Sequence, residues 1–202
     1  MLDFITRMVG SSPIEVVAVA CGLINVVLIV RRSIWNYPFG FVMVLLYARI
    51  FYDYRLYSDA LLQIYFFFIQ FYGLYCWLKG RGLDGKVEVG SMGWQGLALW
   101  LAVTAACWLV LSVLMDRFTD ASLPYWDGAI AALSMLAQFL LSRRYIESWV
   151  FWITVDVLAI GLFSVKGLYP TAALYGVFLV LAITGLLQWR QQQRPAHVTA
   201  VA

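Results

Sequence analysis

The stretch ALLQIYFFFIQFYGLYCWL, residues 60–78, contains no charged side chain. A helix needs about 20 mostly apolar residues to cross a bilayer, and this stretch is of that length. Six further stretches of the same kind follow one another along the chain. The sequence therefore predicts seven transmembrane helices, at 13–30, 35–52, 57–78, 94–115, 124–142, 146–165 and 168–189.

Composition supports a membrane protein. Hydrophobic residues make up 63% of the 202 residues and charged residues 12%, and the mean hydropathy is +0.83. Soluble domains are nearer half apolar. We therefore expect one all-α integral membrane domain over 1–202, in contact with the lipid bilayer, and the net charge of +3 needs no nucleic acid to explain it.

The reactive residues argue against an enzyme. Cys21, Cys76 and Cys107 lie in apolar runs without CxxC spacing, which is typical of packing residues. The single histidine, His197, lies in the polar tail. Histidine triads and histidine metal sites are thus excluded from the interior. We expect no catalytic residue, no metal and no cofactor.

Basic residues are unequally divided between the two ends of the predicted helices, and the richer side is expected to be cytoplasmic. One side carries five: Arg7, Arg49, Arg55, Arg117 and Lys166. The other carries nine: Arg31, Arg32, Lys79, Arg81, Lys86, Arg143, Arg144, Arg190 and Arg194. This distribution predicts an outside N-terminus and a cytoplasmic C-terminus. The Gly-rich segment 79–93 reads as a solvated linker.

The chain also matches itself at a shift of 112 residues without gaps. Arg31 and Arg32 align with Arg143 and Arg144, and the register continues through Tyr57 with Tyr169, Gly73 with Gly185 and Trp77 with Trp189. We expect two parallel three-helix repeats, 13–78 and 124–189, joined by a single linker helix at 94–115. Transporters built from parallel repeats bind substrate near the midplane between them.

The stretch WVFWITVD, 149–156, contains the most unusual interior group. Trp149, Trp152 and Asp156 fall within roughly 60° of one helix face. Asp156 lies near the bilayer centre, where a charge costs a few kcal/mol and marks a functional site. Their repeat-mates Tyr37, Gly40 and Val44 lack the acid and both indoles, which favours an asymmetric ligand. An interfacial aromatic belt is the alternative for the two tryptophans.

Interior amides extend the candidate site. Gln63 and Gln70 lie on one face of a helix, Gln138 lies on another, and Tyr175 is the mate of Gln63. Amides, a carboxylate and aromatic faces suit a flat, cationic ring bearing hydroxyls. The midplane has no Lys or Arg, so a phosphate would enter unneutralised. Each amide could instead bond only a neighbouring helix.

The sequence resembles the PnuC family of bacterial vitamin transporters. The resemblance is carried by SIWNYPFGFVMVLLYARIFYDYRLYSDALLQIYFFFIQFYGLYCW (33–77), LAQFLLSRRYIESWVFWITVDV (136–157) and KGLYPTAALYGVFLVLAITGLLQWR (166–190). It implies a 3+1+3 fold like that of SWEET sugar transporters, a homotrimer in the bacterial inner membrane, and facilitated diffusion of nicotinamide riboside. Pro170 departs from the pattern we expect after the LY pair.

The resemblance also assigns residues. The family's WxxW motif falls on Trp149 and Trp152, and its acid-or-amide position on Asp156. Together with the other interior polar groups, the candidate substrate-binding residues are Trp149, Trp152, Asp156, Gln63, Gln138, Tyr175, Gln70 and Asn36.

Other functions fit the sequence less well. A retinal photoreceptor needs a lysine within the seventh helix, and Lys166 lies before it. No filter-like glycine sequence favours a channel. The remaining alternatives stay within transport: the same fold carrying thiamine or riboflavin, or a proton-coupled transporter in which Asp156 titrates.

Overall fold

The structure, a computed structural model, describes residues 13–53, 57–80, 82, 86–119 and 123–193. Within these ranges it contains seven long α-helices. They are α2 (Pro13–Val30), α3 (Asn36–Asp53), α4 (Tyr57–Lys79), α5 (Trp94–Phe118), α6 (Pro124–Ser142), α7 (Glu147–Val165) and α8 (Tyr169–Gln193). The seven predicted helices are confirmed, with ends that differ by at most four residues.

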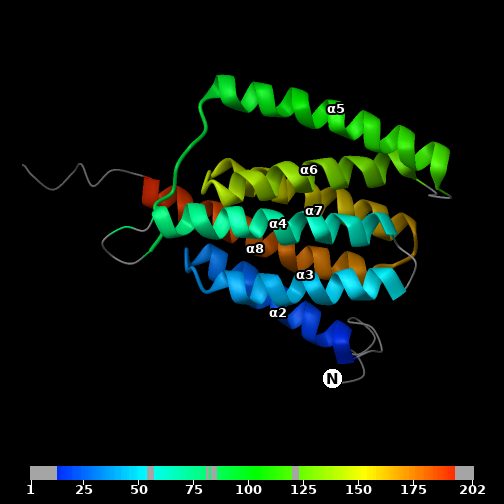
Figure 1. The fold of residues 1–202 in the computed structure, drawn as a ribbon, viewed down its shortest axis with the longest axis horizontal. Helices are drawn as coiled ribbons and strands as arrows, with labels where there is room; N and C mark the ends of the chain where they lie inside the picture. The colour runs from blue at the N-terminus through cyan, green and yellow to red at the C-terminus, as the bar shows by residue number, and fades with distance from the viewer. Residues whose placement is uncertain (1–12, 54–56, 81, 83–85, 120–122, 194–202) are drawn as a thin grey trace, which may run out of the picture.

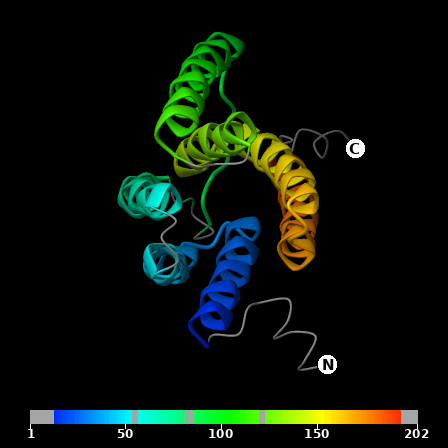
Figure 2. The same cartoon turned by 90° about the vertical axis from the view of Figure 1, so that its right-hand side faces the viewer.

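Six of the helices form a closed ring, viewed end-on in Figure 2. Each helix packs on two others, in the order α2, α3, α4, α6, α7 and α8, with α8 returning to α2. Helix α5 lies outside the ring against α6 (Figure 1). No backbone contact joins α3 to α7 across the centre in the described chain. The centre of the ring is therefore filled, or lined, by side chains alone.

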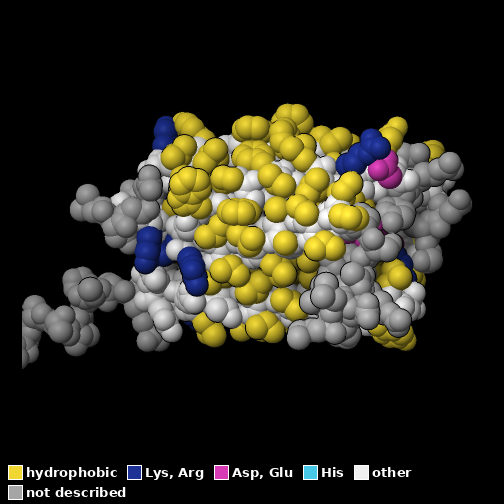
Figure 3. Space-filling model, turned by 90° about the horizontal axis from the view of Figure 1, so that it is seen from below, with side chains coloured by type: hydrophobic (Ala, Val, Ile, Leu, Met, Phe, Trp, Pro, Cys, Tyr) yellow, Lys and Arg dark blue, Asp and Glu magenta, His cyan; other side chains and the backbone are white. Residues whose placement is uncertain are grey.

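The outer surface matches a bilayer. Figure 3 shows hydrophobic side chains over the length of one face, with basic side chains gathered at its two ends. Five described helices, α2, α4, α5, α7 and α8, are long and apolar enough to span a membrane. Helix α5 has the smallest buried share of these. Its exposed face must meet lipid or another protein.

The units α2–α4 and α6–α8 end their first helices in the same way. After α2, Arg32 takes a left-handed φ of 56°, and its N–H bonds Ile29 O while Ser33 N–H bonds Leu28 O. This pair of bonds is a Schellman cap. Arg144 repeats it after α6 with a φ of 65° and the same two bonds, 112 residues later. The matching caps support the predicted duplication.

The two units also hold each other by reciprocal bonds at this same end. The indole N–H of Trp77 in α4 donates to Leu141 O in α6 at 3.1 Å. The indole N–H of Trp189 in α8 donates to Ile29 O in α2 at 3.3 Å. Trp77 and Trp189, like Ile29 and Leu141, are 112 residues apart. The two bonds are thus equivalent: each unit donates one indole hydrogen bond to the same position in the other unit.

The segment 79–93 is not simply solvated, so that expectation was wrong for its second half. Val87 is 2% exposed and belongs to the hydrophobic cluster at the end of the ring, together with Trp77, Trp149 and Trp189. Gly90 forms a parallel bridge with Tyr145. The high Gly and charge content concealed these contacts because they are made by backbone atoms and one valine.

Candidate functional site

Asp156 lies in the middle of α7 and is 4% exposed. It is the only acidic or basic residue among the buried side chains of the described chain. Its carboxylate forms no hydrogen bond or ion pair with any described residue. Because a buried charge is costly unless it is paired, this carboxylate is suited to a cationic or hydrogen-bond-donating ligand. Its equivalent in the first unit, Val44, is buried and apolar.

Trp149 lies in the first turn of α7, two residues after Glu147, and is buried. Its ring meets Trp189 edge-on, with centroids 5.4 Å apart and an interplanar angle of 89°. A Cβ placed on Gly185 would lie 2.5–2.6 Å from the Trp149 ring. Its indole N–H is buried without a partner among the described residues.

Tyr37 takes the equivalent place in the first unit. Its ring meets Trp77 edge-on at 5.6 Å and 88°, and its hydroxyl covers Gly73. The asymmetry inferred from the sequence therefore does not hold for Trp149, because an aromatic side chain packs the same way in both units. It holds for Trp152 and Asp156.

Trp152 marks the largest difference between the units. It is half-buried and packs against the cluster that contains Trp149 and Ala182. Its equivalent is Gly40, where an added Cβ would clash with the side-chain amides of Asn25 and Gln70. The equivalents of those amides are the buried residues Ala137 and Ala182.

The two units thus fill equivalent space with opposite chemistry. The first has a glycine between two amides, and the second has a tryptophan with two alanines at the equivalent positions. One half of the ring therefore offers hydrogen-bonding groups at a level where the other half offers an aromatic face.

Asn25 was not among the predicted site residues, although the structure places it in this amide cluster. Its Nδ2 donates to the backbone carbonyl of Asn36 at 2.8 Å, and both residues are buried. The Asn36 side chain turns away and donates to Ser33 O at 2.7 Å. Comparison of the two units at the same register would have identified Asn25, because its mate Ala137 cannot hydrogen-bond.

The remaining predicted residues lie at other levels of the ring. Gln63 is buried, and its Oε1 has no partner within the described chain. It lies seven residues, roughly 10 Å, from Gln70 along α4. Tyr175 is half-buried and stacks on Phe163, with centroids 5.4 Å apart. Gln138 is half-buried in α6. No described hydrogen bond joins these three to Asp156.

Comparisons with known proteins agree on one family. The family model described as nicotinamide mononucleotide transporter matches residues 12–191. The nicotinamide riboside transporter PnuC of Escherichia coli (strain K12) is 27% identical, over 90% of this chain and 86% of its own. The riboflavin/roseoflavin transporter RibM of Streptomyces davaonensis is 28% identical, over 86% of this chain and 84% of its own.

A solved structure is similar over most of the fold. The crystal structure of the vitamin B3 transporter PnuC gives a TM-score of 0.74 at 28% sequence identity, covering 87% of this chain and 80% of that one. The sequence and fold comparisons therefore identify the same group of membrane transporters.

Proposed function

The chain belongs to the nicotinamide mononucleotide transporter family, and from that membership we propose that it carries nicotinamide riboside across the bacterial inner membrane for use as an NAD precursor. It acts as a transporter and not as an enzyme. The substrate binds inside the ring of six helices, between the units α2–α4 and α6–α8.

The observation that carries the choice of substrate is the unpaired, buried Asp156 carboxylate on the same helix face as Trp152. Nicotinamide riboside is a flat ring with a fixed positive charge. Indole faces attract such a cation, and a carboxylate in a low-dielectric interior complements its charge. Riboflavin is a larger ring system without that charge, so it gains less from Asp156.

The other polar groups complete the proposed contacts. The amide cluster of Asn25 and Gln70 faces the carboxamide or ribose, and Gln63, Gln138 and Tyr175 bond the hydroxyls from other levels. Trp149 closes the site toward the end of the ring where the two units are bonded together. The Trp149 indole N–H, a donor, and Gln63 Oε1, an acceptor, have no partner in the described chain, and the ligand would satisfy both.

The absence of a buried cation favours the riboside over its phosphate ester. In the described chain no Lys or Arg is buried. A phosphate in this interior would lose its hydration and find no opposite charge. The substrate is therefore the nucleoside, although the family model is named for the mononucleotide.

Transport proceeds by facilitated diffusion, as the two units rock against each other around the bound substrate. The end of the ring that carries Arg32 and Arg144 faces the cytoplasm, and the N-terminus lies outside. The protein is a homotrimer. The transport mode and the homotrimer rest on the family resemblance, and the orientation rests on the charge distribution. A labelling assay on inside-out vesicles tests the orientation, and a mass measurement in detergent tests the homotrimer.

The function is tested by uptake of radiolabelled nicotinamide riboside into proteoliposomes. Riboflavin and thiamine serve as competitors, because RibM is a relative. Uptake that the unlabelled riboside abolishes and riboflavin does not would support the proposal. Competition by riboflavin alone would move the chain to the alternative substrate.

A further inference from the structure

The segment that joins α4 to α5 docks on the end of the ring that carries Arg32 and Arg144. We call residues 86–93 the strap. From its contacts with both three-helix units, we propose that the strap is the latch of the cytoplasmic gate, and that it releases the first unit and stays docked on the second when the gate opens. The proposal rests on the proposed transport function.

The strap inserts one side chain, Val87, between the two units. Val87 is 2% exposed within the cluster that contains Ile29 and Trp77 of the first unit and Trp149 and Trp189 of the second. The indole bonds of Trp77 and Trp189 cross between the units in the same place. The units cannot separate at this end unless these contacts break, so the described conformation is closed here.

The strap is bonded more extensively to the second unit. The Gly90 N–H donates to Arg144 O at 3.0 Å, and Ile146 N–H donates to Gly90 O at 3.0 Å. Gln193 Nε2 also donates to Gly90 O, at 2.9 Å. Glu147 Oε1 accepts from Ser91 Oγ and from Met92 N–H. These contacts involve α7, α8 and the turn that precedes α7.

Within the described chain, the strap forms fewer hydrogen bonds with the first unit than with the second. Arg32 Nη1 donates to Val87 O at 3.1 Å, and Glu88 N–H donates to Gly80 O at 3.0 Å. Arg144 Nη1 reaches Gly80 O at 3.2 Å and thereby joins the units directly. Opening therefore costs least if the strap parts from Arg32 and remains on Tyr145, Glu147 and Gln193.

The left-handed conformations of Arg32 and Arg144 fit this role. A non-glycine residue is disfavoured there because its Cβ crowds the following carbonyl oxygen, and a third helix of the chain, α7, uses Gly167 at the same cap position. An arginine is retained at both equivalent positions where the guanidinium reaches the carbonyls of Gly80, Val87 and Glu88. The caps thus place one arginine of each unit on the latch region.

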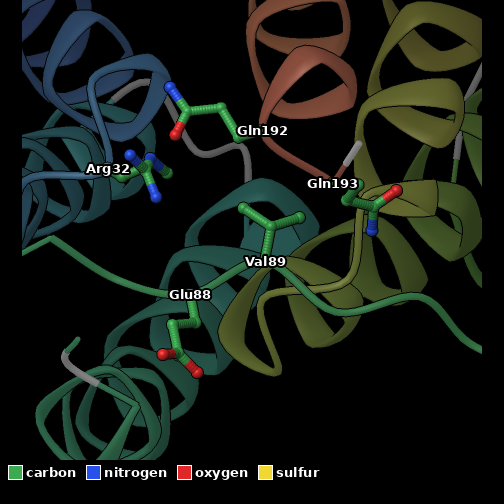
Figure 4. A pocket seen from close by; sticks show the side chains of 5 residues that line it. All are labelled: Arg32, Glu88, Val89, Gln192 and Gln193. Atoms are coloured by element: carbon green, nitrogen blue, oxygen red, sulfur yellow. The ribbon is translucent and has the colours of Figure 1, made fainter. Parts of the chain in front are cut away.

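A cavity of about 510 Å³ is lined by residues of the first unit, the strap and the second unit. Its lining residues are therefore suitable positions for cross-links between the strap and each unit. Figure 4 shows Arg32 of the first unit, Val89 of the strap and Gln192 of the second unit around it. Replacing Cys21, Cys76 and Cys107 by serine or alanine gives a background without reactive thiols. The pair R32C/V89C then joins strap to first unit, and Q192C/V89C joins strap to second unit.

Each pair is bridged by the same bifunctional thiosulfonate reagent in proteoliposomes, and uptake of nicotinamide riboside is measured before bridging, after it, and after reduction. We expect the R32C/V89C bridge to lower uptake about tenfold or more, and reduction to restore it. The Q192C/V89C bridge should change uptake less than about twofold. Because each variant is its own control, misfolding does not enter the comparison.

Two results would overturn the latch: uptake that survives the R32C/V89C bridge, or uptake that is lost with the Q192C/V89C bridge. The same pairs carrying spin labels give a readout that needs no substrate. If the strap is a latch, the distance between the two spin labels takes two values in R32C/V89C, one for the closed gate and one for the open gate, and a single value in Q192C/V89C. A single label-to-label distance in both pairs contradicts the latch. Absence of riboside uptake by the parent protein, with the two spin-label distances present in R32C/V89C, would instead reject the proposed function alone.

Discussion

At the scale of single residues, Trp149 and Trp152 have different environments although they share a helix face. Trp149 is enclosed by Gly185 and Trp189, whereas Trp152 is half-buried at the level where the first unit carries Gly40 and two amides. In the proposed site, Trp149 would therefore combine packing with ligand contact, whereas Trp152 would serve mainly the ligand.

We predict that W152A weakens binding of nicotinamide riboside about ten- to a hundredfold, since base–aromatic contacts contribute about 1–3 kcal/mol. Its unfolding temperature should change little. W149A should lose both affinity and stability, because truncating a core tryptophan costs about 3–5 kcal/mol. Calorimetric titration and thermal unfolding in detergent measure the two properties. Equal unfolding temperatures for the two variants would contradict this division.

The second residue-scale prediction concerns charge. D156N keeps the size of the side chain and removes its negative charge, so the affinity for the cationic riboside should fall about tenfold or more, which corresponds to about 1.4 kcal/mol. D127N is the matched control. Asp127 pairs with Lys166 at 3.0 Å, near the end of the ring opposite Arg32 and Arg144, so the same substitution there removes a charge outside the proposed site. Affinity that is unchanged in D156N would remove the carboxylate from the site.

At the scale of helices, much could be predicted from sequence. Apolar length alone located all seven helices, because lipid requires long uncharged stretches. The constant 112-residue register also predicted which side chains are equivalent. Helix ends were less predictable: α5 and α8 run three and four residues beyond the expected limits, into segments where polar side chains can leave the membrane while the backbone stays helical.

What the sequence could not reveal was how side chains meet between helices. The exchange of Gly40 and two amides for Trp152 and two alanines depends on which faces of α2, α3 and α4 turn together. Periodicity predicts which residues share a face of one helix, but it does not predict which other helix packs against that face. The docking of the strap was hidden for a similar reason, because many of its hydrogen bonds use backbone atoms, as at Val87 and Gly90, and because Val87 is a single apolar residue in a polar segment.

A helix-scale prediction follows from the glycines of α8. G185A should lower the thermal stability, because the added Cβ would lie 2.5–2.6 Å from the buried Trp149 ring, and overpacking of this kind costs about 1–3 kcal/mol. G176A in the same helix is the control, since its added Cβ would meet no atom within 4 Å. Equal unfolding temperatures in detergent would show that the ring can shift freely.

At the scale of the whole molecule, a ring of two similar units around an asymmetric interior is suited to alternating access. Each unit keeps its own cap, its own aromatic–glycine contact and its own indole bond to the other unit. The differences are concentrated at Asp156 and Trp152 and their mates. In the proposed mechanism, motion follows the pseudo-symmetry of the fold, and recognition would depend on the residues that break it.

The coupling prediction belongs to this scale. Facilitated diffusion requires that a pH gradient alone drives no accumulation, provided that the membrane potential is clamped at zero, because the riboside is itself a cation. We therefore expect nicotinamide riboside to reach equal concentrations inside and outside proteoliposomes with or without such a gradient. Accumulation against its concentration gradient when the interior is more alkaline would establish proton coupling, and loss of that accumulation in D156N would assign Asp156 to it.

The most direct test of the central claim is a calorimetric comparison of nicotinamide riboside, nicotinamide mononucleotide, thiamine and riboflavin on the purified protein. An interior with a buried carboxylate, indole faces and, among the described residues, no buried Lys or Arg should bind the riboside and bind its phosphate ester about a hundredfold more weakly or not at all. Equal binding of the mononucleotide, or binding of riboflavin or thiamine in place of the riboside, would contradict the account.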